Sequence, residues 1–149
     1  MTIKIYLDSN IFIEAYESES SERSEAARSV LKMVDEGGVE AVISELVIAE
    51  ILVKPLAEGD YTLANIYSEL FAPQIGYTTC PVDRNSLLEA ARQRAVHAAT
   101  KLPDAIHIAT ARLQGCKAFL TSEARLRVPS DLVRVNLSAS TTSELLSLM

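Results

Sequence analysis

The sequence predicts an α/β fold of three layers, in which helices cover both faces of a mainly parallel sheet. Short apolar runs of strand length alternate along the chain with longer stretches whose apolar residues recur at helical spacing. A length of 149 residues and a hydrophobic content of 48% also suit one compact core. We therefore expect a single domain over residues 1–149.

In the first half of the chain, short apolar runs mark the strands, and capping residues mark the ends of the helices. Two glycines, Gly37 and Gly38, are expected to stop the first long helix. Ser44 can cap the following helix, and Pro55 is expected to end it because proline disfavours helical backbone in the residue before it. The expected elements are a strand over 3–7, a helix over 22–36, a strand over 39–43 and helices over 45–54 and 61–71.

In the second half, Pro103 suits the first position of a helix, where no backbone N–H is needed. In parallel α/β sheets the reactive groups gather beyond the carboxyl ends of the strands, so a functional site is sought there. The expected elements are a strand over 75–79, a long helix over 83–100, a helix over 103–115, strands over 117–121 and 132–135, and a short helix over 144–148.

Several protein classes are not indicated by the sequence. Cys80 and Cys116 are far apart and form no CxxC pair, so neither a disulfide framework nor a zinc cage is expected, and both suit small buried positions in a reducing compartment. The most apolar run, 46–53, is short and contains Glu50, so we expect no membrane-spanning segment. The first apolar stretch ends at Asp8, too early for a signal peptide.

The net charge of −6 is unevenly distributed along the chain. Residues 1–83 hold 15 acids and 5 Lys or Arg, a net −10, whereas residues 84–149 hold 5 acids and 9 Lys or Arg, a net +4. These cations are either ordinary solvated surface charge or a basic rim beside an acidic centre. The rim would contain Arg84, Arg92, Arg94, Lys101, Arg112, Lys117, Arg125 and Arg127.

Two acidic residues of the first half are candidates for a functional site. Asp8 directly follows the first strand, where it can serve a site or cap the next helix. Glu50 lies in an apolar helix that should be largely buried, and a carboxylate there is costly unless it is paired or bound to a cation. The alternative for Glu50 is an ion pair with Lys54, four residues further on.

Two further acids come from the second half. Asp104 lies in the first turn of a helix, where stabilising the helix dipole is a sufficient structural role. Glu123 follows a strand, where Thr121 or Ser122 can cap a short helix. However, Asp8 and Glu123 both follow strands on the edge where sites form, and helices can bring the other two acids to that edge. Oxygen-only ligands of this kind select hard cations such as Mg²⁺ or Mn²⁺.

Other catalytic arrangements are not indicated. The sequence has no nucleophile elbow, no Gly-rich phosphate loop and no serine with a matched histidine and aspartate. His97 and His107 are expected to have packing or hydrogen-bonding roles.

Four segments together resemble the PIN-domain family, including VapC-type toxins, across nearly the whole chain. They are Ile-Tyr-Leu-Asp-Ser-Asn at 5–10, Ser-Glu-Leu-Val-Ile-Ala-Glu at 44–50, Leu-Pro-Asp-Ala-Ile-His-Ile-Ala-Thr-Ala at 102–111 and Phe-Leu-Thr-Ser-Glu at 119–123. The third is the most specific.

The resemblance implies which residues form the site. Asp8, Glu50 and Asp104 would be the catalytic acids that bind Mg²⁺ or Mn²⁺, with Glu123 as a fourth ligand. The family usually has aspartate at this last position, so a site of three acids is better supported than one of four. Ser9, Asn10 and Thr121 are expected to support the ligands or to contact the substrate.

The resemblance also implies a cytoplasmic, metal-dependent endoribonuclease that hydrolyses phosphodiester bonds of single-stranded RNA. As the toxin of a toxin–antitoxin pair it would bind a small antitoxin and form a homodimer. The alternative is an inactive PIN-like scaffold that binds proteins. A haloacid-dehalogenase enzyme would need a second aspartate where Asn10 stands, and a receiver domain would need an acidic pair before its phosphoacceptor. Neither pattern is present.

Overall fold

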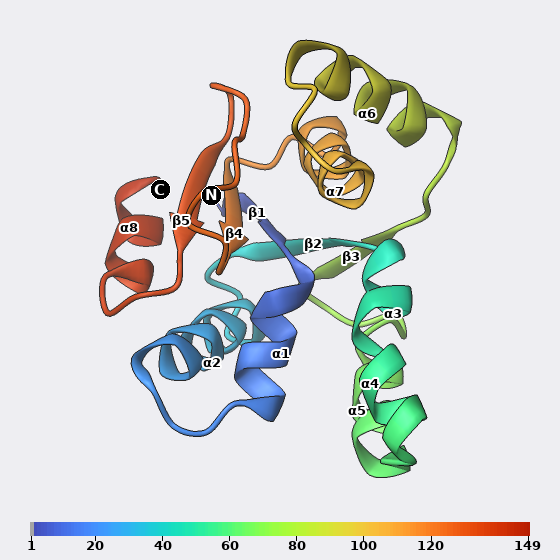
Figure 1. The fold of residues 1–149 in the computed structure, drawn as a ribbon. Helices are drawn as coiled ribbons and strands as arrows, with labels where there is room; N and C mark the ends of the chain where they lie inside the picture. Colours follow the sequence, from blue (N-terminus) through green and yellow to red (C-terminus); the bar gives the residue numbers. More distant parts are fainter. Residues whose placement is uncertain (1) are drawn as a thin grey trace.

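The computed structural model describes residues 2–149 and has a five-stranded sheet in the order β3-β2-β1-β4-β5, with every neighbouring pair parallel (Figure 1). The strands are β1 (Lys4–Leu7), β2 (Glu40–Ser44), β3 (Tyr77–Cys80), β4 (Ala118–Thr121) and β5 (Val133–Asn136). The helices are α1 (Ser9–Glu17), α2 (Glu22–Asp35), α3 (Leu46–Ile51), α4 (Val53–Glu58), α5 (Tyr61–Glu69), α6 (Arg84–Val96), α7 (Leu102–Leu113) and α8 (Thr141–Ser147).

Alternating side chains of the central strand β1 pack into cores on opposite faces of the sheet. Ile5 and Leu7 belong to a core that includes residues of α1, α2, α3 and α8, whereas Tyr6 packs with Ile108 of α7. Figure 1 shows α6 and α7 on one side of the sheet and α1 and α2 on the other. The predicted three-layer α/β fold with a parallel sheet is therefore confirmed.

The register of the central strands determines where the site can form. Leu7 of β1 pairs with Leu120 of β4, and the N–H of Asp8 donates to the carbonyl of Leu120 at 3.0 Å. The strand order runs from β1 to β2 on one side and to β4 on the other, so β1 lies at the topological switch point. Asp8 therefore lies at the place in the sheet where a crevice is expected.

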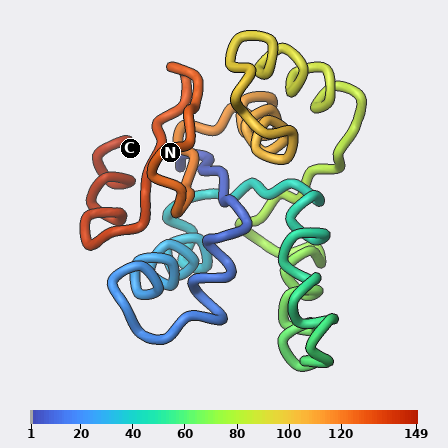
Figure 2. The backbone as a smooth tube through the Cα atoms, viewed as in Figure 1, coloured from blue at the N-terminus to red at the C-terminus, as the bar shows by residue number. Residues whose placement is uncertain are grey.

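The expected helix over 45–54 is wrong in its end point. The chain instead forms α3 and then α4, which meet at Leu52 (Figure 2). Pro55 lies in the first turn of α4, where its missing N–H leaves no bond unmade. The N-cap of α3 is Glu45, without a side-chain capping bond, and Ser44 lies one residue earlier, where its hydroxyl accepts the N–H of Leu46 at 3.1 Å. In both views α3, α4 and α5 extend away from the sheet.

Three other expectations are corrected. The long helix over 83–100 ends at Val96, because a tight loop follows: the Thr100 N–H donates to the His97 carbonyl at 3.0 Å, and Arg94 Nε donates to the Thr100 carbonyl at 3.1 Å. Residues 122–132 form no helix, and the hydroxyl of Thr121 instead accepts the N–H of Glu123 at 3.1 Å. Helix α8 begins earlier than expected, at Thr141.

The two cysteines agree with the sequence-based expectation: both are free and buried. Between residues 2 and 149, no helix has the length and apolar character that crossing a membrane requires.

Candidate active site at the carboxyl edge of the sheet

Asp8 is the most deeply buried acid of the site, with 4% of its surface exposed. Its Oδ1 accepts the N–H of Ser9 at 2.8 Å, so it caps α1 as the structural alternative expected. Its Oδ2 accepts the hydroxyl of Thr121 at 2.9 Å and the amide of Asn10 at 3.3 Å. Capping therefore uses one oxygen, and side chains from α1 and β4 hold the other.

Asn10 and Thr121 connect α1 to the end of β4. The Asn10 Nδ2 also donates to the Thr121 hydroxyl at 3.2 Å, and its Oδ1 accepts the N–H of Ser122 at 3.0 Å. Thr121 is completely buried. These bonds fix the start of the segment that carries Glu123, as well as the carboxylate of Asp8.

Glu50 comes to the same edge from α3. Its side chain is 31% exposed, so the prediction of a largely buried carboxylate is only partly right. The expected alternative partner, Lys54, instead pairs with Glu17 at 3.4 Å. The Glu50 carboxylate bonds to His107 Nε2 through Oε1 at 2.6 Å, and this same nitrogen lies 3.8 Å from Asp8 Oδ1. Glu50 and Asp8 therefore approach one imidazole ring from two elements.

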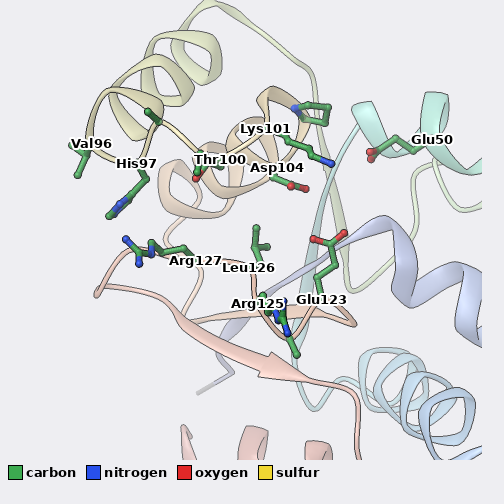
Figure 3. A pocket seen from close by; sticks show the side chains of 14 residues that line it. Glu50, Val96, His97, Thr100, Lys101, Asp104, Glu123, Arg125, Leu126 and Arg127 are labelled. Atoms are coloured by element: carbon green, nitrogen blue, oxygen red, sulfur yellow. The ribbon is translucent and has the colours of Figure 1, made fainter.

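Asp104 and Glu123 face each other across a cleft of about 1000 Å³ (Figure 3). Asp104 comes from the first turn of α7, and Glu123 from the segment after β4. Burial, then the negative charges of Glu123 and Asp8, raise the pKa of Asp104 above its usual value. Glu50 contributes in the same direction. The neighbouring carboxylates therefore add to the effect of burial, and His107 acts in the opposite direction.

The same cleft has a positively charged end. The tight loop after α6 and the segment 123–127 form its two walls, and Figure 3 shows His97 and Arg127 at the end opposite Glu50. Lys101 and Arg125 also line the cleft. Among residues 2–149, no acid lies within ion-pair distance of Lys101, Arg125 or Arg127. Carboxylates and cations therefore line the same cleft: Figure 3 shows Lys101 and Arg125 beside Asp104 and Glu123, and Arg127 at the end away from Glu50.

Comparison with known protein families shows to which family this chain belongs. The model of the PIN domain matches residues 5–132, which include all four acids of the site. The chain belongs to the PIN-domain family. The resemblance stated from the sequence is thereby confirmed, and membership in this family of nucleases supports a hydrolytic nuclease. No curated protein matches the sequence significantly.

Solved structures of PIN-type toxins share the fold at low sequence identity. A VapBC complex from Rickettsia felis, bound to a DNA fragment from its promoter, matches with a TM-score of 0.70 and 12% identity over 90% of this chain and 98% of its own. A toxin–antitoxin complex from Klebsiella pneumoniae matches at 0.65 and 18%, over 87% and 95%. A VapC toxin of Mycobacterium tuberculosis that cleaves the sarcin-ricin loop matches at 0.62 and 14%, over 77% and 86%.

The fold brings the predicted acids to one edge of the sheet, but their carboxylates are not close enough together to coordinate a single ion. Among residues 2–149, no three His, Cys, Asp or Glu side chains are grouped tightly enough to hold a metal ion as they stand. The available donors are nonetheless carboxylate oxygens, which Mg²⁺ and Mn²⁺ prefer. The residues thus have the chemistry that such a cation needs.

Sequence reasoning missed one polar residue of this site. Tyr6 was treated only as part of an apolar strand, yet its hydroxyl lies 2.5 Å from His107 Nδ1 and accepts the N–H of Ser44 at 3.2 Å. The only signal was that tyrosine carries a hydroxyl, which needs a partner wherever it is buried. His107 was correctly assigned a hydrogen-bonding role, but its partners were not identifiable from the sequence.

Proposed function

We propose that this PIN-domain protein is a metal-dependent endoribonuclease that hydrolyses phosphodiester bonds of single-stranded RNA. Asp8, Glu50 and Asp104 would hold Mg²⁺ or Mn²⁺, and Glu123 would assist through its longer side chain or through water. The main support is geometric: Glu50, Asp104 and Glu123 line one cleft, and Asp8 and Glu50 both approach the imidazole of His107.

The bound cation would lower the pKa of a water molecule and neutralise charge that develops on the phosphoryl oxygens. The chain's own residues prepare this site. Ser9, Asn10 and Thr121 hold the carboxylate of Asp8 in a fixed orientation, so little reorganisation is needed when the ligands engage. Thr121 and Asn10 also fix the backbone before Glu123, which determines where that longer side chain begins.

The charge distribution of the cleft supports RNA as the substrate. Phosphate backbones bind to Lys and Arg side chains, and the affinity depends on salt because counterions are released. Lys101, Arg125 and Arg127 line the cleft without acidic partners, so they are available to the strand on one side of the cut bond. Of the expected basic rim, Lys101, Arg125 and Arg127 line the cleft. Arg92 and Arg112 instead pair with acids outside it, so the rim is smaller than the sequence predicts.

The cellular role that we propose is that of a toxin. Its support is fold similarity to VapC toxins and toxin–antitoxin complexes. In this role the protein would be cytoplasmic, would form a homodimer, and would be inhibited by a small antitoxin. The remaining alternative is a PIN-domain scaffold that binds proteins without cutting RNA.

A cleavage assay separates these possibilities. Purified protein is incubated with labelled single-stranded RNA in Mg²⁺, Mn²⁺ or EDTA, beside the variants Asp8→Asn and Asp104→Asn. We expect internal cleavage with either metal, none with EDTA and none with either variant. Cleavage that survives EDTA and both substitutions would show a contaminating or metal-independent nuclease, and intact RNA under all conditions would favour the scaffold.

A further inference from the structure

The hydroxyl of Tyr6 begins a chain of hydrogen bonds that runs through the protein core to the cleft. Tyr6 lies in β1 and is completely buried, packed against Phe119 with ring centroids 5.0 Å apart. Its oxygen accepts the backbone N–H of Ser44 at 3.2 Å. A buried hydroxyl without a partner is costly, so its own proton must be donated to another group.

That group is the imidazole of His107. The ring lies in α7 with 1% of its surface exposed, and its Nδ1 is 2.5 Å from the Tyr6 oxygen. Burial, then the charge of Asp8, raises the pKa of Tyr6 well above its ordinary value, so the hydroxyl keeps its proton. When Tyr6 donates to Nδ1, the second ring nitrogen carries the hydrogen, and Nε2 lies 2.6 Å from Glu50 Oε1.

The directions of these bonds are consistent from end to end. The Ser44 N–H donates to Tyr6, Tyr6 donates to His107, and His107 donates to Glu50, so each buried polar atom of the chain has a partner. The chain joins β2, β1, α7 and α3. The chain of bonds ends on the Glu50 carboxylate, which lines the cleft. Hydrogen bonds that served only the stability of the core would not need to end there.

We infer that Tyr6 and His107 are positioning residues for the Glu50 carboxylate. The side chain of Glu50 has three rotatable bonds and is 31% exposed, so it would otherwise sample several rotamers. Among residues 2–149 no Lys or Arg pairs with it. His107 fixes one carboxylate oxygen, Oε1, and leaves the other for a ligand in the cleft. This inference rests on the proposed function, in which that ligand is Mg²⁺ or Mn²⁺.

The two substitutions at His107 differ in whether a donor remains. His107→Gln keeps an N–H donor at a similar distance along the side chain, whereas His107→Leu keeps the volume approximately and removes the donor. Tyr6→Phe removes only the hydroxyl that fixes the ring tautomer. As a matched control, Ile108→Val perturbs the packing of the neighbouring buried position of α7, which makes no polar contact with the chain of bonds.

The readout is Mn²⁺ affinity, measured without RNA by titration calorimetry. Loss of a residue that orients a metal ligand typically weakens binding about 10- to 100-fold. We expect a loss of this size for His107→Leu, a smaller loss for Tyr6→Phe, partial recovery in His107→Gln and none in Ile108→Val. Thermal melts identify any variant that fails to fold. If His107→Leu does not fold, the Mn²⁺ affinity of His107→Gln is compared with that of wild type instead.

A second measurement does not depend on metal. Nitrogen NMR of the metal-free wild type, recorded over a pH series that reaches the neutral ring, is expected to show His107 as the tautomer with hydrogen on Nε2, and Tyr6→Phe should change the Nδ1 signal. A hydrogen on Nδ1 alone would overturn the inference. So would wild-type Mn²⁺ affinity in His107→Leu, even if the protein cleaves RNA. If the wild type itself neither binds Mn²⁺ nor cleaves RNA, the proposed function fails, and the inference about Glu50 fails with it.

Discussion

Replacing Lys101 and Arg127 by glutamine removes two positive charges from opposite walls of the cleft. Within the described residues 2–149, neither side chain forms an ion pair, and both are exposed, so the fold should not change. Each cation that contacts a phosphate contributes about 0.7 to the slope of log affinity against log salt for a single strand. Loss of both contacts should therefore reduce the slope by about 1.4.

The same relation gives the loss of affinity. With equal affinities at 1 M salt, where the lost phosphate contacts no longer contribute, a slope change of about 1.4 corresponds to roughly 25-fold weaker binding at 0.1 M salt. The ratio of the wild-type affinity to that of the variant should shrink roughly 7-fold between 50 and 200 mM salt. Fluorescence anisotropy with labelled single-stranded RNA measures both quantities, and EDTA in the buffer prevents cleavage during the titration.

The matched control is Lys32→Gln with Lys117→Gln, which changes the net charge equally. Lys32 lies in α2, on the other side of the sheet from α6 and α7, and pairs with Glu36 (Figure 1). Lys117 directly precedes β4, at the sheet edge opposite the site. We expect this control to retain nearly the wild-type slope. Equal slopes in the two double variants would refute an RNA path through the cleft.

Four further predictions follow from the site. Asp8→Asn and Asp104→Asn should each abolish RNA cleavage without changing the circular dichroism spectrum, and full activity in either variant would contradict the ligand assignment. Thr121→Ala removes the hydroxyl that bonds to the buried Asp8 oxygen and to the Glu123 N–H. Urea unfolding should show a loss of about 1–3 kcal/mol in the free energy of unfolding, which Thr121→Ser largely avoids. Equal stability of the two variants would count against these bonds. Mn²⁺ at 100 times its Kd should stabilise the protein by about 2.7 kcal/mol, and an equal gain in Asp104→Asn would contradict binding at this residue. In the metal-free protein, the raised pKa of Asp104 means that its carboxyl group binds a proton more tightly in the folded state than in the unfolded state. Wild type should therefore lose stability relative to Asp104→Asn as pH rises from about 4 through the folded pKa. A stability difference that stays constant with pH would contradict this prediction.

The parts of the site that depend on local signals were predictable from the sequence. Asp8 follows an apolar run and Asp104 follows a proline, and both signals place a residue at an element boundary without knowledge of the rest of the chain. Parallel strands then bring their carboxyl ends to one edge. Glu50 was identified because a carboxylate stands out in an apolar helix, although its partner was not.

The remaining parts depend on contacts between distant segments. His107 meets Glu50 across 57 residues and Tyr6 across 101, and no periodicity in the sequence reports such a meeting. The loop after Val96 falls within the helix expected over 83–100, whereas bonds made by Thr100 fold it back into a cleft wall. The end expected at Pro55 rests on the bias of proline against helical backbone in the preceding residue, but the break lies earlier, at Leu52, and Pro55 falls in the first turn of the next helix.

The most direct measurement is a crystal structure grown with Mn²⁺ and recorded at the manganese absorption edge. We expect an anomalous peak bound by oxygens of Asp8, Glu50 and Asp104, with the carboxylates drawn together relative to their present positions. A well-ordered site with these three acids intact and no peak at saturating Mn²⁺, or a peak held by other residues, would contradict a metal centre at this edge of the sheet.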